Sequence, residues 1–175
     1  MCIRDRNNIA LIQQEVFLFS DSILNNITLF DETITKSDVL DASKAIGIHS
    51  FIDSLPNGYD YVLGERGVNL SAGQRQLIAF LRVYVRESRI LILDEATSSI
   101  DTETEKLLKR ALKKVSKDRT TIIIAHRLST IIEADKILHI KDGLVLEEGT
   151  HSDLMNKEGP YSKMYKLQNT DSHNR

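Results

Sequence analysis

The order of apolar and polar residues predicts helices in the first half of the chain and strands mainly in the second. Asn8–Ile12 is a short apolar run that predicts a strand. Ser22–Ser54 then carries apolar residues at helical spacing, and Thr35 with Asp38 has the spacing of a helix-capping box. After a turn and a glycine-containing loop, a further helical pattern covers about Ser71–Arg86. This half therefore predicts one short strand followed by a helical region.

The spacing of apolar residues changes from helical to strand-like in the second half of the chain. Arg89–Leu93 (RILIL) is a continuous apolar run, typical of a strand covered on both faces in a parallel sheet. Thr120–Ala125 (TTIIIA) predicts a second buried strand of the same kind. Between them, Thr102 and Glu105 have capping-box spacing at the start of a helix with its apolar residues on one side. Strand, helix and strand in this order predict a parallel α/β sheet with a right-handed crossover.

The last fifty residues predict a smaller group of elements. Two strands, 136–140 and 144–148, flank an Asp142-Gly143 turn and predict a β-hairpin. Two closing helices are expected over 150–168, and 169–175 is expected to be a loose, flexible tail.

Composition narrows the functional classes. The chain has 175 residues, 41% of them hydrophobic and 27% charged, which suits one globular domain with a buried core. A net charge of -2 and dispersed basic residues do not indicate an unaided nucleic-acid binder. The single cysteine, Cys2, excludes an internal disulfide. No apolar run approaches the roughly 20 residues needed to cross a bilayer, so a membrane part would lie elsewhere.

Met1–Arg6 (MCIRDR) fits none of these elements. The string resembles the product of one reading frame of a common sequencing adaptor. We expect these residues to be an artefact to be set aside, the alternative being a genuine start with a frayed end.

Charged side chains follow both buried strands, at the edge where parallel α/β sheets bind ligands. Asp94 is placed to hold Mg²⁺ through water. Glu95 is placed to polarise an attacking water, and His126 to contact a transferring phosphoryl group. Taken singly, Asp94-Glu95 could be a solvent-facing charge pair and His126 a structural histidine. Together on adjacent strands, they favour a catalytic site.

A candidate anion site lies in Leu70-Ser71-Ala72-Gly73-Gln74. A serine followed by small residues at a helix start leaves several backbone N–H groups accessible, with the positive end of the helix dipole behind them. Such a site suits a terminal phosphate. By itself, Ser-Ala-Gly is only a helix cap.

In this order and spacing, LSAGQ, RILILDEATSSID and TTIIIAHRLST resemble the nucleotide-binding domain of ABC transporters. LSAGQ is similar to the family signature LSGGQ except at Ala72, where the added methyl implies a modest effect. ILILDE resembles the Walker B strand with its catalytic Glu at Glu95. The segment ending at Asp101 resembles the D-loop, and His126 the switch histidine.

Two further segments extend the resemblance. Gln14 falls at the Q-loop, with Gln13 in place of the usual proline. Leu63–Gly67 resembles the loop that touches the transmembrane coupling helices in exporter-type domains. The resemblance covers roughly 7–168 and implies a P-loop-type, mostly parallel α/β core of about 87–148 with an α-helical signature subdomain of about 20–86.

The resemblance implies an ATPase that drives substrate export, with ATP and Mg²⁺ as cofactors. Two such domains, identical or different, would meet head to tail around two ATP molecules. A transmembrane domain is expected on the same chain, which places this one at the cytoplasmic face of the plasma membrane. The implied residues are Glu95 and His126 for catalysis, Asp94 and Gln14 for the metal, and Gln14, Leu70, Ser71, Ala72, Gly73, Gln74 and Asp101 for ATP.

No G-x-x-x-x-G-K-[ST] phosphate loop occurs in these 175 residues. We therefore expect an incomplete domain, the C-terminal part, which alone binds ATP poorly and hydrolyses none. One alternative is a soluble ATPase of the same superfamily, of the DNA-repair or translation-factor type. The short, non-heptad stretch 15–70 argues against the long coiled coils of the former, and the latter would carry two such domains. The other is a non-hydrolysing half-site, against which Glu95 and His126 argue.

Overall fold

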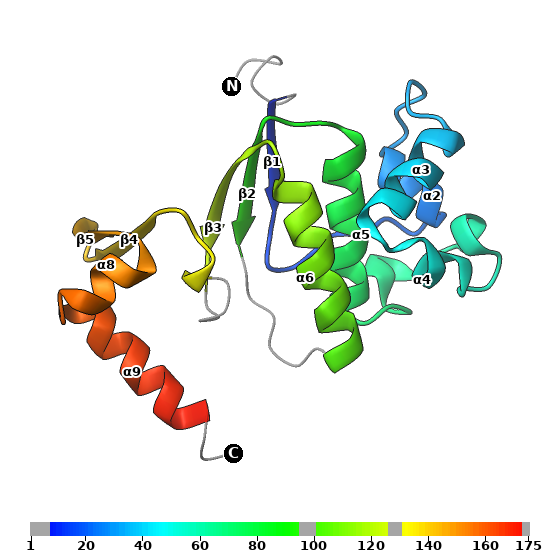
Figure 1. The fold of residues 1–175 in the computed structure, drawn as a ribbon. Helices are drawn as coiled ribbons and strands as arrows, with labels where there is room; N and C mark the ends of the chain where they lie inside the picture. Colours follow the sequence, from blue (N-terminus) through cyan, green and yellow to red (C-terminus); the bar gives the residue numbers. More distant parts are fainter. Residues whose placement is uncertain (1–7, 95–100, 126–130, 173–175) are drawn as a thin grey trace. The chain divides into compact units, whose positions relative to one another are not determined.

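Three parallel strands form the larger of the two sheets in the described residues. The computed structural model describes residues 8–94, 101–125 and 131–172, which fall into two compact units that divide after Ile124. In the first unit, β1 (Ile9–Ile12), β2 (Ile90–Asp94) and β3 (Thr120–Ile124) lie in the order β1-β2-β3, and both pairings are parallel (Figure 1). The predicted parallel α/β sheet is confirmed.

Two long helices, α5 (Ala72–Val85) and α6 (Thr102–Ser116), cover one face of this sheet and run opposite to the strands (Figure 1). Leu91 and Leu93 of β2 are buried beneath them. Side chains on the opposite face of the sheet are exposed to solvent. Ile122 and Ile124 of β3 are each 53% exposed. The prediction of strands buried on both faces is therefore wrong, because the described helices of this unit pack against only one side.

A group of short helices precedes α5. They are α2 (Ile23–Thr28), α3 (Lys36–Ile46) and α4 (His49–Asp53), followed by the 3₁₀ turns η1 (Gly58–Asp60) and η2 (Glu65–Gly67). Helices α2 and α3 pack against α5, and α4 packs against α3 and η1. The core that they share with the sheet and with α6 includes these fully buried residues: Ile23, Ile27, Val39, Ile48, Ile52, Ile78 and Leu81. This is the helical region that the sequence predicts.

Capping residues separate these helices. Thr35 and Asp38 form the predicted capping box at the start of α3: the Thr35 hydroxyl accepts a hydrogen bond from the Asp38 backbone N–H (3.2 Å), and the Asp38 carboxylate accepts one from the Thr35 N–H (2.8 Å). Between α2 and α3, Leu29 and Phe30 both adopt left-handed backbone conformations. A left-handed residue ends a helix, so the single helical pattern of the sequence becomes several short helices.

The start of α6 differs from the prediction. Asp101, and not Thr102, is the N-cap, because its carboxylate accepts a hydrogen bond from the backbone N–H of Thr104 (2.8 Å). The N-cap therefore lies one residue before the predicted one, and Asp101 caps the helix without a capping box. The apolar side of the helix is as expected, with Leu108, Ala111 and Val115 buried.

The second unit contains a hairpin and two helices. Strands β4 (Ile137–Lys141) and β5 (Leu144–Gly149) are antiparallel around Asp142 and Gly143, both in left-handed conformations, which confirms the predicted turn. Helix α8 (His151–Asn156) and helix α9 (Pro160–Ser172) follow. Because α9 continues to Ser172, residues 169–172 are helical rather than the expected loose tail. Within the described ranges, no helix is long and apolar enough to span a membrane.

Gly67 provides a test of this packing. Its backbone is left-handed (φ +69°), and an added Cβ would lie 2.8 Å from Cδ1 of the fully buried Leu18. We expect Gly67→Ala to lower the free energy of unfolding by about 1–2 kcal/mol for the backbone and about 1–3 kcal/mol for overpacking. Gly47 is the control, since it is left-handed (φ +82°) with nothing within 4 Å of an added Cβ. Chemical denaturation measures both variants, and equal losses would contradict the steric argument.

Candidate functional site

The carboxyl ends of the strands gather the first group of predicted site residues. Ile12 of β1 lies opposite Leu93 of β2, so Gln14 leaves the sheet at the edge where Asp94 ends β2. Ile124 of β3 lies opposite Asp94, so the chain leaves β3 at this edge as well. Glu95 and His126 are outside the described residues. The sheet register thus places the segments that lead to the predicted catalytic residues side by side.

The two predicted metal ligands differ in exposure. Asp94 is half-buried at the end of its strand, and Gln14 is exposed just after β1. A search of the described residues finds no group of three His, Cys, Asp or Glu side chains that could hold a metal ion. One carboxylate and one amide oxygen beside solvent fit Mg²⁺, which keeps several waters and needs few protein ligands.

The predicted anion site occupies the first turn of α5. Ser71 is the N-cap: its hydroxyl accepts a hydrogen bond from the Gln74 backbone N–H (3.2 Å), and the Gln74 side chain accepts one from the Ser71 N–H (2.9 Å). Ser71 and Ala72 are exposed, whereas Gly73 is buried. Since this capping box engages only the Gln74 amide of the first turn, the Ala72 and Gly73 amides have no capping partner, and a contact of these amides with an anion stays a prediction.

Contacts behind the signature hold it in place. Leu70 is buried, and its carbonyl accepts a hydrogen bond from Nη1 of Arg75 (2.6 Å). The preceding loop carries the exposed Glu65 and Arg66, and Arg66 has a left-handed backbone (φ 52°). The segment that sequence analysis assigned to membrane coupling is thus a tight, exposed turn just before the signature.

Asp101 caps the N-terminus of α6. The hydrogen bonds from Thr104 to its carboxylate hold the pKa of Asp101 below its usual value. The side chain is exposed, and capping of α6 accounts for its position. A contact between Asp101 and a nucleotide stays a prediction.

The signature and the strand ends form two separate groups. No hydrogen bond or ion pair described for the chain joins Ser71–Gln74 to Gln14 or Asp94. Both groups nevertheless lie toward the same end of the first unit, because α5 runs opposite to the strands (Figure 1).

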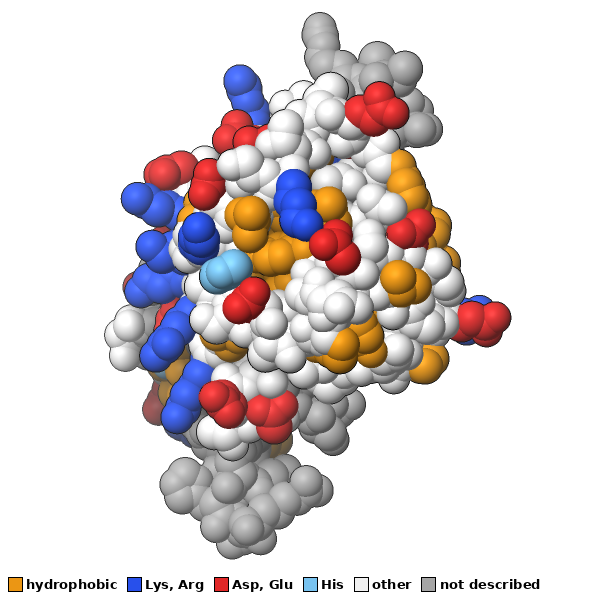
Figure 2. Space-filling view, turned by 90° about the vertical axis from the view of Figure 1, so that its right-hand side faces the viewer, with side chains coloured by type: hydrophobic (Ala, Val, Ile, Leu, Met, Phe, Trp, Pro, Cys, Tyr) orange, Lys and Arg blue, Asp and Glu red, His pale blue; other side chains and the backbone are white. Residues whose placement is uncertain are grey.

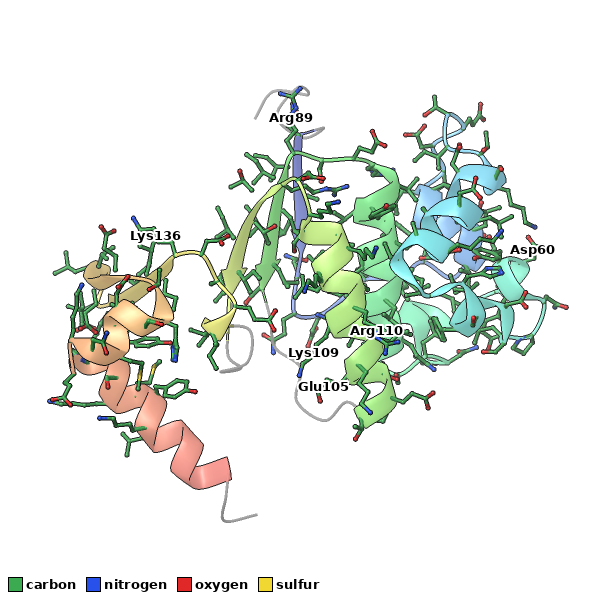
Figure 3. All side chains as sticks on the ribbon, viewed as in Figure 1. Asp60, Arg89, Glu105, Lys109, Arg110 and Lys136 are labelled. Carbon is green, nitrogen blue, oxygen red and sulfur yellow. The ribbon has the colours of Figure 1, made fainter. Side chains whose placement is uncertain are left out.

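Helix α6 collects basic side chains on its exposed side. Lys109 and Arg110 project from this helix in Figure 3, and Lys109 pairs with Glu105 (3.2 Å). Basic side chains line one side of the view in Figure 2, among acidic and apolar ones. The exposed basic residues of the helix are Lys106, Lys109, Arg110, Lys113 and Lys114. The sequence prediction of dispersed basic residues understates this local cluster.

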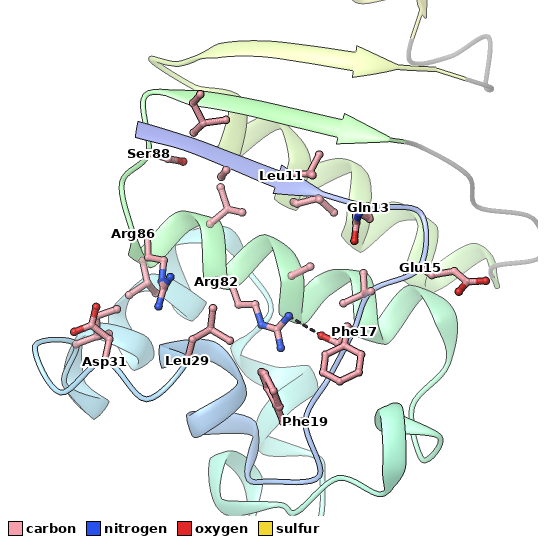
Figure 4. A pocket seen from close by; sticks show the side chains of 18 of the residues that line it. Leu11, Gln13, Glu15, Phe17, Phe19, Leu29, Asp31, Arg82, Arg86 and Ser88 are labelled. Atoms are coloured by element: carbon pink, nitrogen blue, oxygen red, sulfur yellow. Dashed lines mark hydrogen bonds between the residues drawn. The ribbon is translucent and has the colours of Figure 1, made fainter. Parts of the chain in front are cut away.

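Sequence analysis missed a cavity beside the Gln14 segment. It has a volume of about 720 Å³ and lies between β1, residues 13–19 and α5 (Figure 4). Phe17 and Phe19 line it, in edge-to-face contact at 5.1 Å between ring centroids, and both are exposed. Its polar lining includes Arg82 of α5 and Arg86, the residue at the C-terminal cap of that helix. An arginine within the otherwise apolar run LIAFLRVYV was the available signal.

Comparison with known families decides the identity of the domain. The family model for ABC transporters matches residues 2–98, more than half of the chain. The chain belongs to the ABC transporter family. The match includes the predicted Gln14, signature and Walker B segments, and it confirms the family that the sequence predicts.

Relatives of this ABC transporter chain are exporters. Proteins of Staphylococcus aureus strains COL and N315, each named multidrug export ATP-binding/permease protein, are 50% identical over 164 residues, which is 94% of this chain and 28% of each relative. A solved structure of a bacterial Atm1-family ABC exporter with ATP bound matches with a TM-score of 0.83 at 40% identity, covering 93% of this chain and 28% of that one. The chain spans about 28% of the length of these relatives.

Proposed function

We propose that this chain provides the Walker B, switch and signature parts of an ATPase domain that powers export of a substrate across a membrane. The observation that carries the proposal is the meeting of the Gln14 and Asp94 segments at one edge of the parallel sheet. Parallel sheets bind ligands at this edge. Membership of the ABC transporter family supports a nucleotide site, since the names of the relatives combine ATP binding with a permease and with export.

Four residues would serve the reaction. Asp94 and Gln14 would hold Mg²⁺ together with water, and the metal would neutralise the phosphate oxygens. The Glu95 carboxylate would accept a proton from the attacking water, and His126 would donate a hydrogen bond to the transferring phosphoryl group. We propose these last two roles from the position of each residue directly beyond its strand.

The signature would act on the nucleotide of a partner domain. Ser71 and Ala72 are exposed at the helix terminus and are not joined to Asp94 of their own chain. A second nucleotide-binding domain, arranged head to tail, would bring its ATP to this terminus. The Ala72 and Gly73 amides would then donate hydrogen bonds to the terminal phosphate.

The cavity beside the Gln14 segment would receive the membrane part of the protein. Its apolar rim includes Phe17, Phe19 and Leu29, and the first two are more than 40% exposed. Exposed aromatic side chains that line a hollow suit an inserted apolar anchor. The relatives' names combine an ATP-binding part with a permease, so we place the membrane part on the same protein and this domain on the cytoplasmic face.

Asp94→Asn tests the proposed function. In the full-length protein purified in lipid nanodiscs, the parent should hydrolyse Mg–ATP. The variant should need about 10–100-fold more Mg²⁺ for half-maximal turnover, because an amide replaces the charged ligand. Asp41→Asn, at an exposed position of α3, is the control and should leave the Mg²⁺ titration unchanged. An unshifted titration for Asp94→Asn would refute the metal role, and absence of turnover in the parent would refute the proposed function.

A further inference from the structure

Arg82 connects three chain segments through one guanidinium. Its Nη1 donates a hydrogen bond to the Phe17 carbonyl (2.8 Å), and its Nε donates one to the Asn26 carbonyl (2.6 Å). Its Nη2 donates a third to the Asn26 side-chain oxygen (3.0 Å). Figure 4 shows the side chain reaching from α5 across the cavity to the segment that carries Phe17. Helix α5, helix α2 and the chain three residues beyond Gln14 therefore meet at a single side chain.

Asn26 completes the contact. It is fully buried, and its side-chain oxygen also accepts a hydrogen bond from the Phe19 backbone N–H (2.8 Å). Its Nδ2 donates to the Phe19 carbonyl (3.0 Å). Residues 17–19 are thus held from both sides, by Arg82 and by Asn26, through backbone groups that do not depend on the identity of the side chains at 17–19.

Burying the charged guanidinium of Arg82 costs desolvation energy, which indicates that the geometry of its hydrogen bonds matters. Burial, and secondarily repulsion from Arg86, lowers the pKa of Arg82 to about 10. No ion pair of Arg82 with a carboxylate occurs in the part of the chain that the structure describes. The guanidinium is instead satisfied by carbonyl oxygens. Its planar fork of donors binds several acceptors at fixed angles, which a lysine ammonium on a flexible stem does not reproduce.

Helix α5 extends this contact to the signature. Ser71 caps the helix, and Arg82 lies on the same continuous helix, whose residues Leu77, Ile78 and Leu81 are buried in the core. A packed helix of this length moves as a rigid element. Displacement of residues 17–19 would therefore be transmitted to the N-terminus of α5.

From these contacts we infer that Arg82 is a positioning residue, which fixes Gln14 relative to the signature serine by clamping the segment 17–19 to α5. The inference rests on the proposed function. It adds that Gln14 keeps a fixed place relative to Ser71, because Arg82 ties the segment after Gln14 to the helix that Ser71 caps. Arg82 itself touches neither nucleotide nor metal in this arrangement.

A double-mutant cycle tests the inference in the full-length protein in nanodiscs. Arg82→Lys keeps the charge but loses the fork, so Mg–ATP turnover should fall by about 10–100-fold as Gln14 is displaced. In a Gln14→Ala background, which retains slower turnover, the same substitution should change the rate by less than about two-fold. A merely structural role would lower turnover by the same factor in both backgrounds, and that result would overturn the inference. A Gln14→Ala variant that keeps parental turnover would also overturn the inference.

Arg119→Lys is the matched control. Arg119 is also a partly buried arginine whose Nη1 donates a hydrogen bond to a backbone carbonyl, that of Val83 (3.1 Å), and it neither contacts 17–19 nor lines the cavity. Arg119→Lys should leave Mg–ATP turnover within about two-fold of the parent.

Hydrogen–deuterium exchange without nucleotide provides a readout that does not depend on ATPase activity. Peptides covering 15–22 should exchange faster in Arg82→Lys than in the parent and in Arg119→Lys, while peptides from α3 stay unchanged. Unchanged exchange over 15–22 would overturn the clamp. A parent without Mg–ATP turnover but with faster exchange in Arg82→Lys would refute the proposed function and leave the clamp supported.

Discussion

Glu95→Gln is expected to lower the Mg–ATP turnover of the full-length protein by about 10²–10⁴-fold, the range associated with loss of a general base. Glutamine is nearly isosteric with glutamate, but its neutral amide does not accept a proton from the attacking water. The metal ligand Asp94 and the helix terminus at Ser71 are unchanged in this variant. ATP binding should therefore stay within about two-fold of the parent, because sites that do not share partners act independently.

Two measurements distinguish a role of Glu95 in the chemical step from a role in ATP binding. Single-turnover hydrolysis reports the chemical step, and equilibrium binding of a fluorescent ATP analogue reports affinity. Glu87→Gln is the control, since Glu87 is exposed just before the amino end of β2, at the opposite end of that strand. Turnover of Glu95→Gln within a few-fold of the parent would assign the base to another residue. A loss of binding equal to the loss of turnover would instead indicate a structural role for Glu95.

Elements with strong local signals follow directly from the sequence. Thr35 and Asp38 cap α3 because each side chain needs only the backbone three residues away. Ser71 caps α5 for the same reason, and Asp142-Gly143 adopts left-handed conformations that few other residue pairs tolerate. In each case the determining contact lies within a few residues along the chain, so the sequence pattern contains it.

Competition between neighbouring signals explains the error at α6. Asp101 and Thr102 are adjacent, and both residue types are good N-caps. Both pairs, Asp101 with Thr104 and Thr102 with Glu105, have capping-box spacing, but only Thr102 with Glu105 has the residue types of a capping box. The structure selects Asp101. Local pattern alone gives no reason to prefer the earlier residue, because the choice depends on where the chain enters the helix.

Burial of side chains and contacts between distant residues could not be predicted from the sequence. Ile122 and Ile124 belong to an apolar run, yet both are exposed, since an apolar run does not specify what covers it. Arg82 and Phe17 are 65 residues apart, and only the fold brings them together. For the candidate site, the signature and strand-end residues were predictable from motif spacing. The cavity and the clamp beside Gln14 were not.

Ser71→Arg is expected to abolish turnover in a dimer of identical variant subunits. The arginine side chain would occupy the exposed helix terminus where a partner's terminal phosphate is proposed to bind, so that neither nucleotide site of this dimer would close. Loss of the hydroxyl cap costs about 1 kcal/mol, too little to unfold the domain. Ser54→Arg, at the exposed end of α4, is the control and should retain turnover and the same melting temperature.

Mixing subunits determines which nucleotide Ser71 serves. In a dimer of one Ser71→Arg and one Glu95→Gln subunit, a head-to-tail arrangement leaves one site with an intact Glu95 and an intact partner signature. The other site has both defects. Random pairing of equal amounts should therefore restore turnover to roughly a quarter of the parental value, although each variant alone is inactive. If Ser71 acted on the nucleotide of its own subunit, both sites of the mixed dimer would be defective. Absence of recovery on mixing, with mixed dimers verified by affinity tags, would contradict the head-to-tail assignment.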